Sequence, residues 1–319
     1  MKVLDFRNTE VLLPDFLIVG APKSGTTSLY HYLKQHPEIC LPEVKEPCFF
    51  SSYGIPESIF LKNIFPMAKE KLVTEYDEYL SLFSSFNKTG KRIIGEASTH
   101  YLFQYEETIS NLKFFYKSQL SNLKIIIVLR NPIEAAYSNY QMWAMKGLEV
   151  ADFEMALHED QTRYHNQNYN IAYLHKYSYY EQVKTYLDNF ENVKIYLYEE
   201  LQSEPEQLVK KIFNYLGVDG SFVPDDIGIK YNISGKLRVK SLHKFLYEEN
   251  TLKTFLIPVA KKIGTQKFRD RIRKKVTDAN VKRVSMKSST RQFLKKTFSS
   301  NILKTGDLIG QDLSTWLEY

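Results

Sequence analysis

The chain has 319 residues, of which 43% are hydrophobic and 25% charged, and it carries a net charge of +6 at pH 7. This composition is typical of a globular protein with a sizeable core and argues against a disordered or fibrous chain. The two cysteines, Cys40 and Cys48, lack zinc-ligand spacing and argue against a secreted disulfide framework, so we expect a cytoplasmic protein. No run approaches the roughly 18 apolar residues of a membrane-spanning helix, and the N-terminus lacks the layout of a signal peptide.

The predicted strands are apolar runs without polar alternation, as expected for strands buried on both faces of a parallel sheet. They cover Phe16–Val19, Arg92–Gly95, Lys124–Leu129 and Val193–Tyr198. The predicted helices cover Thr26–Gln35, Pro132–Met145, Tyr177–Phe190 and Glu204–Leu216. Their alternation predicts an α/β fold of three layers, with a mainly parallel sheet flanked by helices. No repeat or linker divides the chain, so residues 1–319 are interpreted as a single domain.

The first predicted strand runs into a glycine loop and then a helix, an order that is typical of phosphate binding. The loop lies within "PDFLIVGAPKSGTTSLYHYL", residues 14–33. The spacing of Gly20 and Gly25 fits an ATP-binding P-loop, but Thr26 stands where that loop has its lysine, which here lies inside the loop as Lys23. The expected phosphate ligands are Lys23, Ser24, Gly25, Thr26, Thr27 and Ser28. For Thr27 and Ser28, helix capping alone is the alternative.

The strand "LKIIIVLR" ends in Arg130, where a P-loop ATPase usually has an aspartate that holds Mg²⁺. Arginine instead offers a planar fork that matches phosphate oxygens. Asn131 can cap the next helix and Pro132 fits its first turn, which places Ser138 on that helix eight residues after Arg130. These residues predict a phosphate-rich ligand that is bound without a metal.

Six stretches occur in the chain in this order: "PKSGTTSL", "HPEICLPEVKEPCFF", "GEASTHYL", "RNPIEAAYSNY", "YNISGKLR" and "DLIGQDLSTWL". Together they resemble the PAPS-dependent sulfotransferase family, in particular its bacterial and heparan-sulfate-modifying branches, from about residue 14 to residue 319. The resemblance implies a P-loop-like fold and an enzyme that moves the sulfuryl group of PAPS to an acceptor hydroxyl and releases PAP. The glycine loop would hold the 5′-phosphosulfate, and Arg130 with Ser138 would hold the 3′-phosphate.

The resemblance also implies roles for single residues. Glu46, just before Pro47-Cys48-Phe49-Phe50, would be the general base, and Lys23 would stabilise charge on the bridging oxygen. Glu43 is the rival base, and His100 is a candidate for a second acid or base, with a structural role as the alternative.

Arg238 would reach the 3′-phosphate, as basic residues in this part of the family do, with Lys236 and Lys240 as competitors. Residues 236–296 hold 19 Lys and Arg against 4 Asp and Glu, a balance of +15. We expect a basic, mostly helical C-terminal part over residues 236–319. It is either a solvated surface, a wall for an anionic ligand or a patch for peripheral membrane contact.

The chain departs from the family pattern at several positions. Cys48 stands where His is common, Thr99 where Pro is common and Ala135 where Arg is frequent. Ala97 stands where heparan-modifying relatives often carry Lys, which weakens the claim to that acceptor. From the resemblance as a whole we expect a carbohydrate or glycolipid acceptor and no nucleic-acid partner. The tyrosine- and asparagine-rich tract 164–180 either lines a sugar site or forms an ordinary amphipathic helix with its preceding loop.

Two other functions stay open at this point. A P-loop small-molecule kinase would use a similar loop, although the usual lysine and strand-end aspartate are absent. A non-catalytic module for polyanions would use the basic tract.

Overall fold

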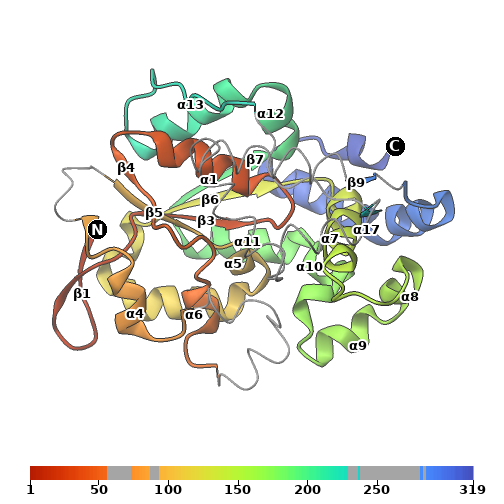
Figure 1. Cartoon of the computed structure of the whole chain (residues 1–319), viewed down its shortest axis with the longest axis horizontal. Coiled ribbons are helices and arrows are strands. Elements are labelled where there is room, and N and C mark those ends of the chain that lie inside the picture. The colour runs from red at the N-terminus through yellow and green to blue at the C-terminus, as the bar shows by residue number, and fades with distance from the viewer. Residues whose placement is uncertain (56–72, 87–92, 229–235, 238–280, 283–284, 319) are drawn as a thin grey trace, which may run out of the picture.

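The computed structural model describes residues 1–55, 73–86, 93–228, 236–237, 281–282 and 285–318 (Figure 1). Arg238, Lys240 and most of the basic tract 236–296 lie outside the described residues, and so does Arg92 at the start of a predicted strand. Of Lys236 only the backbone is described, in the short strand β8. Within the described part of the chain, no helix combines the length and apolar character needed to cross a bilayer.

A five-stranded parallel sheet forms the centre of the molecule. Its strands, in spatial order, are β4 (Ile39–Cys40), β5 (Ile93–Ala97), β3 (Phe16–Gly20), β6 (Lys124–Leu129) and β7 (Asn192–Leu197). All four neighbouring pairs are parallel. Every residue of β3 and β5 is buried, which fits the unbroken apolar run of β3, whereas β5 also buries the polar Glu96. The predicted mainly parallel sheet is confirmed.

Helices cover both faces of this sheet and complete the three predicted layers (Figure 1). One face carries α1 (Thr26–Gln35), α12 (Tyr198–Ser203) and α13 (Pro205–Leu216). The other carries α2 (Phe49–Ser52), α4 (Tyr76–Ser81), α5 (His100–Phe103), α6 (Tyr105–Tyr116) and α11 (Tyr179–Asn189). Alternate residues of β3 belong to two separate hydrophobic cores. Phe16 and Ile18 lie in the core beneath α1, α12 and α13, and Leu17 and Val19 lie in the core on the opposite face of the sheet.

The remaining elements lie outside these two layers of helices. α7 (Pro132–Met145), α8 (Phe153–His158), α9 (Asp160–His165), η3 (Tyr169–Ile171), α10 (Tyr173–Lys176), α17 (Ser288–Ile309) and η4 (Ser314–Leu317) gather on one side (Figure 1). β1 (Lys2–Leu4) and β2 (Glu10–Leu12) form an antiparallel hairpin near the N-terminus. β8 (Lys236–Leu237) and β9 (Val281–Lys282) pair antiparallel, and η2 (Lys117–Asn122) precedes β6.

Several predicted boundaries differ from the observed ones for local reasons. The helices Thr26–Gln35 and Pro132–Met145 have the predicted bounds. The helix predicted over Tyr177–Phe190 begins at Tyr179, because α10 ends before it and a short turn separates the two. β5 continues through Glu96 to Ala97, because these residues pair with Leu17 and Ile18 of β3. The hydroxyls of Tyr79 and Tyr101 donate to the buried Glu96 carboxyl.

Candidate active site

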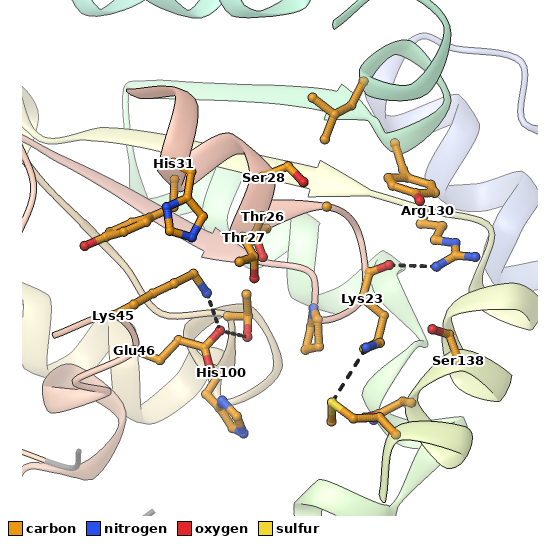
Figure 2. A pocket seen from close by; sticks show the side chains of 18 of the residues that line it. Lys23, Thr26, Thr27, Ser28, His31, Lys45, Glu46, His100, Arg130 and Ser138 are labelled. Carbon is orange, nitrogen blue, oxygen red and sulfur yellow. Dashed lines mark hydrogen bonds and ion pairs between the residues drawn. The ribbon is translucent and has the colours of Figure 1, made fainter. Parts of the chain in front are cut away.

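A cavity of about 690 Å³ opens at the carboxyl ends of the central strands (Figure 2). Ligand sites of parallel α/β sheets usually lie at the carboxyl ends of the strands. The glycine loop, the start of α1, the loop around Glu46 and parts of α7 and α10 line the cavity. Its walls hold more cations than carboxylates, with Lys23, Lys34, Lys45, Arg130, Lys146 and Lys176 against Glu43 and Glu46, and they also contain His31 and His100.

The glycine loop brings backbone close to the cavity at the start of α1. Gly25 is the N-cap of α1 and has φ 79°, a left-handed conformation that favours glycine. A Cβ at this position would lie 2.5 Å from the Leu201 side chain, so a larger residue would force the loop to move. Thr26, Thr27 and Ser28 follow in the first turn of α1 and line the cavity, and their role as phosphate ligands stays a prediction. Ser24 is fully buried and is not part of the cavity wall.

Lys23 extends from the loop into the cavity (Figure 2). Its Nζ lies 3.6 Å from Met142 Sδ, and no carboxylate of the described residues lies within ion-pair distance. Burial and the nearby charges of Arg130 and Lys146 lower the pKa of Lys23 to about 8. The amine is therefore mostly charged near pH 7 and is surrounded by other cations, an arrangement that favours an anionic ligand.

Arg130 lies on the same side of the cavity as Lys23 and Ser138 (Figure 2). Its Nη1 donates to the Lys23 carbonyl at 2.8 Å, and its guanidinium carbon lies 4.6 Å from the centre of the Tyr198 ring. These two contacts orient the guanidinium. Among the described residues no carboxylate forms an ion pair with it, so most of its N–H groups can bind phosphate oxygens.

Glu46 lies across the cavity from Arg130 (Figure 2). Its Oε1 accepts hydrogen bonds from Lys45 Nζ at 2.8 Å and from Thr99 Oγ1 at 3.1 Å, and its side chain is 35% exposed. Burial acts to raise the pKa of Glu46, but the charge of Lys45, together with His100 and Thr99, lowers it to about 2. The carboxylate is therefore ionised at neutral pH. Thr99, which stands where the family commonly has Pro, is a contact that the sequence did not predict.

The rival carboxylate, Glu43, occupies a different position. Its side chain is 91% exposed and its carboxylate pairs with Lys34 Nζ at 2.7 Å at the edge of the cavity. Glu46 is thus the better placed of the two for contact with a bound acceptor.

His100 is held on both sides of its ring. Nε2 lies 2.8 Å from Asn170 Oδ1, and Nδ1 lies 4.0 Å from Cys48 Sγ. Burial lowers the pKa of His100 to about 4 and raises the pKa of Cys48 well above its usual range. A neutral ring that accepts from the Cys48 thiol and donates through Nε2 satisfies both contacts, so this geometry favours the structural role over a second acid or base.

Sequence reasoning missed two cavity residues that lie within the tract 164–180. Asn170 and Lys176 line the cavity, whereas Tyr173 and Tyr177 of the same tract are fully buried in the core. The only signal for Lys176 was a single lysine inside a tyrosine-rich tract. Within the described ranges, no group of three or more His, Cys, Asp and Glu side chains could hold a metal ion.

Comparison with known proteins gives one matching family model, described as a sulfotransferase domain, over residues 13–227. Membrane-associated sulfotransferase kil1 of Dictyostelium discoideum is 31% identical over 155 residues, which cover 46% of this chain and 28% of that protein. Human carbohydrate sulfotransferase 15 is 30% identical over 172 residues, which cover 44% and 29%. The matches thus span less than a third of these relatives. The crystal structure of a sulfotransferase from Alicyclobacillus acidocaldarius has 29% identity and a TM-score of 0.68, and the match covers 96% of this chain and 99% of that one.

Proposed function

The chain belongs to the sulfotransferase domain family, and on this premise we propose that it moves the sulfuryl group of PAPS to a hydroxyl group of a carbohydrate or glycolipid. The main support for the proposal is that cations and a carboxylate lie on different sides of the cavity. Lys23 and Arg130, which have no carboxylate partner among the described residues, lie on one side, and the carboxylate of Glu46 lies on the other (Figure 2). A relative that is named a carbohydrate sulfotransferase supports a saccharide acceptor.

The cavity fits a nucleotide that carries two separate anionic groups. Its volume of about 690 Å³ is in the usual range for ligands of this size. The glycine loop and the N-terminus of α1 would bind the 5′-phosphosulfate, because the free backbone N–H groups at a helix start attract anions. Arg130 and Ser138 would bind the 3′-phosphate. Arg238, a predicted third contact, lies outside the described residues and stays a prediction.

Bound PAPS supplies the sulfuryl group. The acceptor oxygen forms a bond to sulfur while the bond between sulfur and the 5′-phosphate oxygen breaks, and PAP leaves. Lys23, as an ammonium, would stabilise the negative charge that grows on this leaving oxygen. Such transfers have loose transition states that depend on position and charge, so we propose that the cations of the cavity suffice and that no metal is required.

Glu46 would accept the proton of the acceptor hydroxyl. Lys45 and Thr99 both bond to Oε1, and within the described part of the chain Oε2 has no hydrogen-bond partner, so Oε2 can face the acceptor. The ion pair with Lys45 keeps Glu46 ionised but makes it a weak base. We propose that bound donor sulfate draws Lys45 away from the carboxylate and so makes Glu46 more basic at the time of transfer.

A first experiment separates this proposal from the kinase and the polyanion-binding module. We expect PAP to raise the thermal unfolding temperature, and ³⁵S from labelled PAPS to appear on saccharide acceptors in buffer that contains EDTA. Stabilisation by ATP with Mg²⁺ but not by PAP would support the kinase. Binding of heparin with no stabilisation by PAP and no transfer would support the polyanion-binding module.

A second experiment tests the base. Glu46→Gln keeps the size of the side chain and removes its negative charge, so turnover should fall about 10²–10⁴-fold while PAP affinity stays nearly unchanged. The matched variant Glu43→Gln changes a carboxylate at the edge of the same cavity and should have much less effect. Near-normal turnover of Glu46→Gln together with a loss in Glu43→Gln or His100→Ala would show that another residue is the base.

A further inference from the structure

Lys176, at the end of α10, is a buried cation in the cavity wall. Its residue exposure is 2%. Nζ donates to the Asn170 carbonyl at 2.8 Å and lies 5.6 Å from the centre of the Phe103 ring. No described carboxylate lies within ion-pair distance of it. A buried ammonium with one neutral hydrogen-bond acceptor is unfavourable, because burial opposes the charged form.

The acidic groups whose charge acts on Lys176 bond to other residues. Asp160 and Glu46 favour its charged form, whereas burial is the larger effect and lowers the pKa of Lys176 to about 7. Asp160 accepts from the backbone N–H of Leu174 and from His175 Nδ1, at 2.8 and 2.7 Å. Glu46 is paired with Lys45. The remaining hydrogens of Lys176 Nζ therefore have no acceptor among the described residues.

Asn170 adds a second buried donor beside Lys176. Its residue exposure is 4%, and its Oδ1 accepts from His100 Nε2 at 2.8 Å. The Asn170 amide is oriented with its oxygen toward His100, and in the tautomer in which Nε2 carries the ring proton Nδ1 can accept from the Cys48 thiol. Its Nδ2 is buried and has no hydrogen-bond partner among the described residues.

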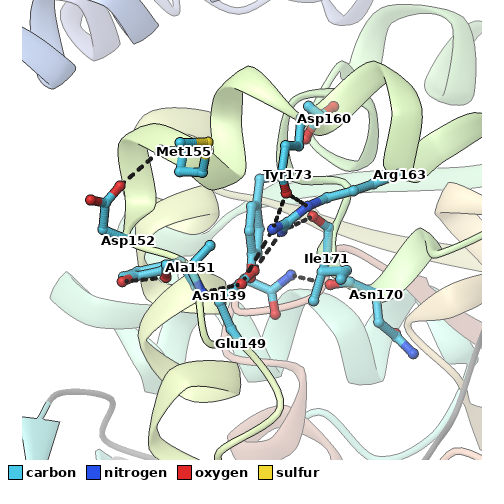
Figure 3. Close-up of polar contacts among 12 residues, drawn as sticks. Asn139, Glu149, Ala151, Asp152, Met155, Asp160, Arg163, Asn170, Ile171 and Tyr173 are labelled. Atoms are coloured by element: carbon cyan, nitrogen blue, oxygen red, sulfur yellow. Dashed lines mark hydrogen bonds and ion pairs between the residues drawn. The ribbon is translucent and has the colours of Figure 1, made fainter.

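Polar contacts among residues that do not line the cavity hold this segment in place. Arg163 bonds to Glu149 at 2.5 Å, to Glu159 at 3.0 Å and to the Ile171 carbonyl at 3.2 Å (Figure 3). Tyr173 donates to Glu149 at 3.0 Å. The amide of Asn170 points away from this cluster (Figure 3). The two donor groups are thus fixed before a ligand binds, which lowers the entropy that binding would cost.

We propose that Lys176 and Asn170 form a subsite for a negatively charged oxygen group of the acceptor, a carboxylate, a sulfate or a phosphate. The inference rests on the proposed function and narrows the acceptor to an acidic saccharide or glycolipid. His100 links Asn170 to the Glu46 side of the cavity, so an acceptor held here by its charged group would present a hydroxyl toward Glu46. Lys146, whose Nζ lies 4.8 Å from the centre of the Trp143 ring in the same cavity, adds positive potential. Charged oxygens are the strongest partners for such donors.

The test uses the full chain saturated with PAP and paired small probes in isothermal titration calorimetry. Methyl β-D-glucuronide and methyl β-D-glucoside differ by one carboxylate, and glucose 6-sulfate and glucose 6-phosphate distinguish the kind of anion. We expect at least one charged probe to bind about tenfold or more tightly than the glucoside. Lys176→Met should abolish this preference. Lys34→Met, which removes a cation at the edge of the cavity that is paired with Glu43, should keep it.

A second variant tests the subsite independently, in case Lys176→Met does not fold. Asn170→Asp keeps the shape of the side chain and its contact with His100 but adds a negative charge, so charged probes should then bind more weakly than the glucoside. Equal binding of all probes by the wild type, or an unchanged preference in both variants, would overturn the subsite. PAP affinity, measured in the same samples, separates the two proposals. If PAP does not bind the wild type, the donor proposal fails, and if PAP binds without any charge preference, only the subsite fails.

Discussion

The ion pair between Lys45 and Glu46 determines how basic the proposed base is, and Lys45→Met tests this directly. Nζ and Oε1 are 2.8 Å apart, and Lys45 is the strongest of the influences that lower the pKa of Glu46 from 4.5 to about 2. Burial raises the pKa of Glu46, and without Lys45 only the weaker effects of His100 and Thr99 would oppose it. The Glu46 side chain is 35% exposed, so solvent screens part of the interaction, and we expect the pKa of Glu46 to rise by about one to two units.

The sign of the stability change follows from the direction of this shift. A carboxyl whose pKa is lower in the folded than in the unfolded state contributes stability above its unfolded pKa, and this contribution is lost as the pH falls through the folded value. Lys45→Met should therefore lower the free energy of unfolding near neutral pH by about 1 kcal/mol, with the screening taken into account. The difference from the wild type should shrink as the pH falls from 4.5 toward 2.

Two measurements check the prediction, and neither needs a known acceptor. NMR titration of protein with ¹³C-labelled glutamate side chains, with Glu46→Gln to identify the resonance, gives the pKa of Glu46. Urea unfolding near pH 7 and pH 3 gives the stability difference. Lys34→Met, which breaks the exposed pair with Glu43, should leave the Glu46 titration unchanged. If the Glu46 resonance titrates at the same pH in Lys45→Met and the wild type, the ion pair does not control this carboxylate.

Three further variants test the proposed PAPS site and the buried carboxyl of Glu96. Arg130→Ala should weaken PAP binding about 10- to 100-fold in calorimetry, because a charge-assisted phosphate contact is lost; an unchanged affinity would contradict the 3′-phosphate assignment. Lys23→Ala should lower turnover more than PAP affinity, because the charge that it stabilises grows in the transition state; a larger effect on PAP affinity would argue for simple anchoring. Burial raises the pKa of Glu96 to about 7 from an ordinary 4.5, so the wild type should lose stability as the pH rises through this interval. Glu96→Gln should remove that loss in urea unfolding near pH 5 and pH 8, and the same pH dependence in both proteins would refute the assignment.

The sequence alone determined the parts of the site that follow from local backbone preferences. The helix that starts at Thr26 and the helix that starts at Pro132 have the predicted bounds, because a left-handed Gly25 begins the first and Asn131 caps the second through the backbone N–H of Ile133. The strands before them are apolar and buried, and parallel strands place their carboxyl ends at one edge of the sheet. Lys23 and Arg130 could therefore be placed in one cavity before the structure was known.

Only the tertiary structure decided which side chains contact one another across that edge. Thr99 bonds to Glu46 from 53 positions away, and Asn170 bonds to His100 from 70 positions away. No local pattern encodes such pairs, because they depend on how β5, α5 and η3 come together around the cavity. Lys176 is the clearest case: its sequence neighbours predict an ordinary helix with its preceding loop, and its burial beside Asn170 arises because Arg163 and Asp160 fix that segment against the cavity wall.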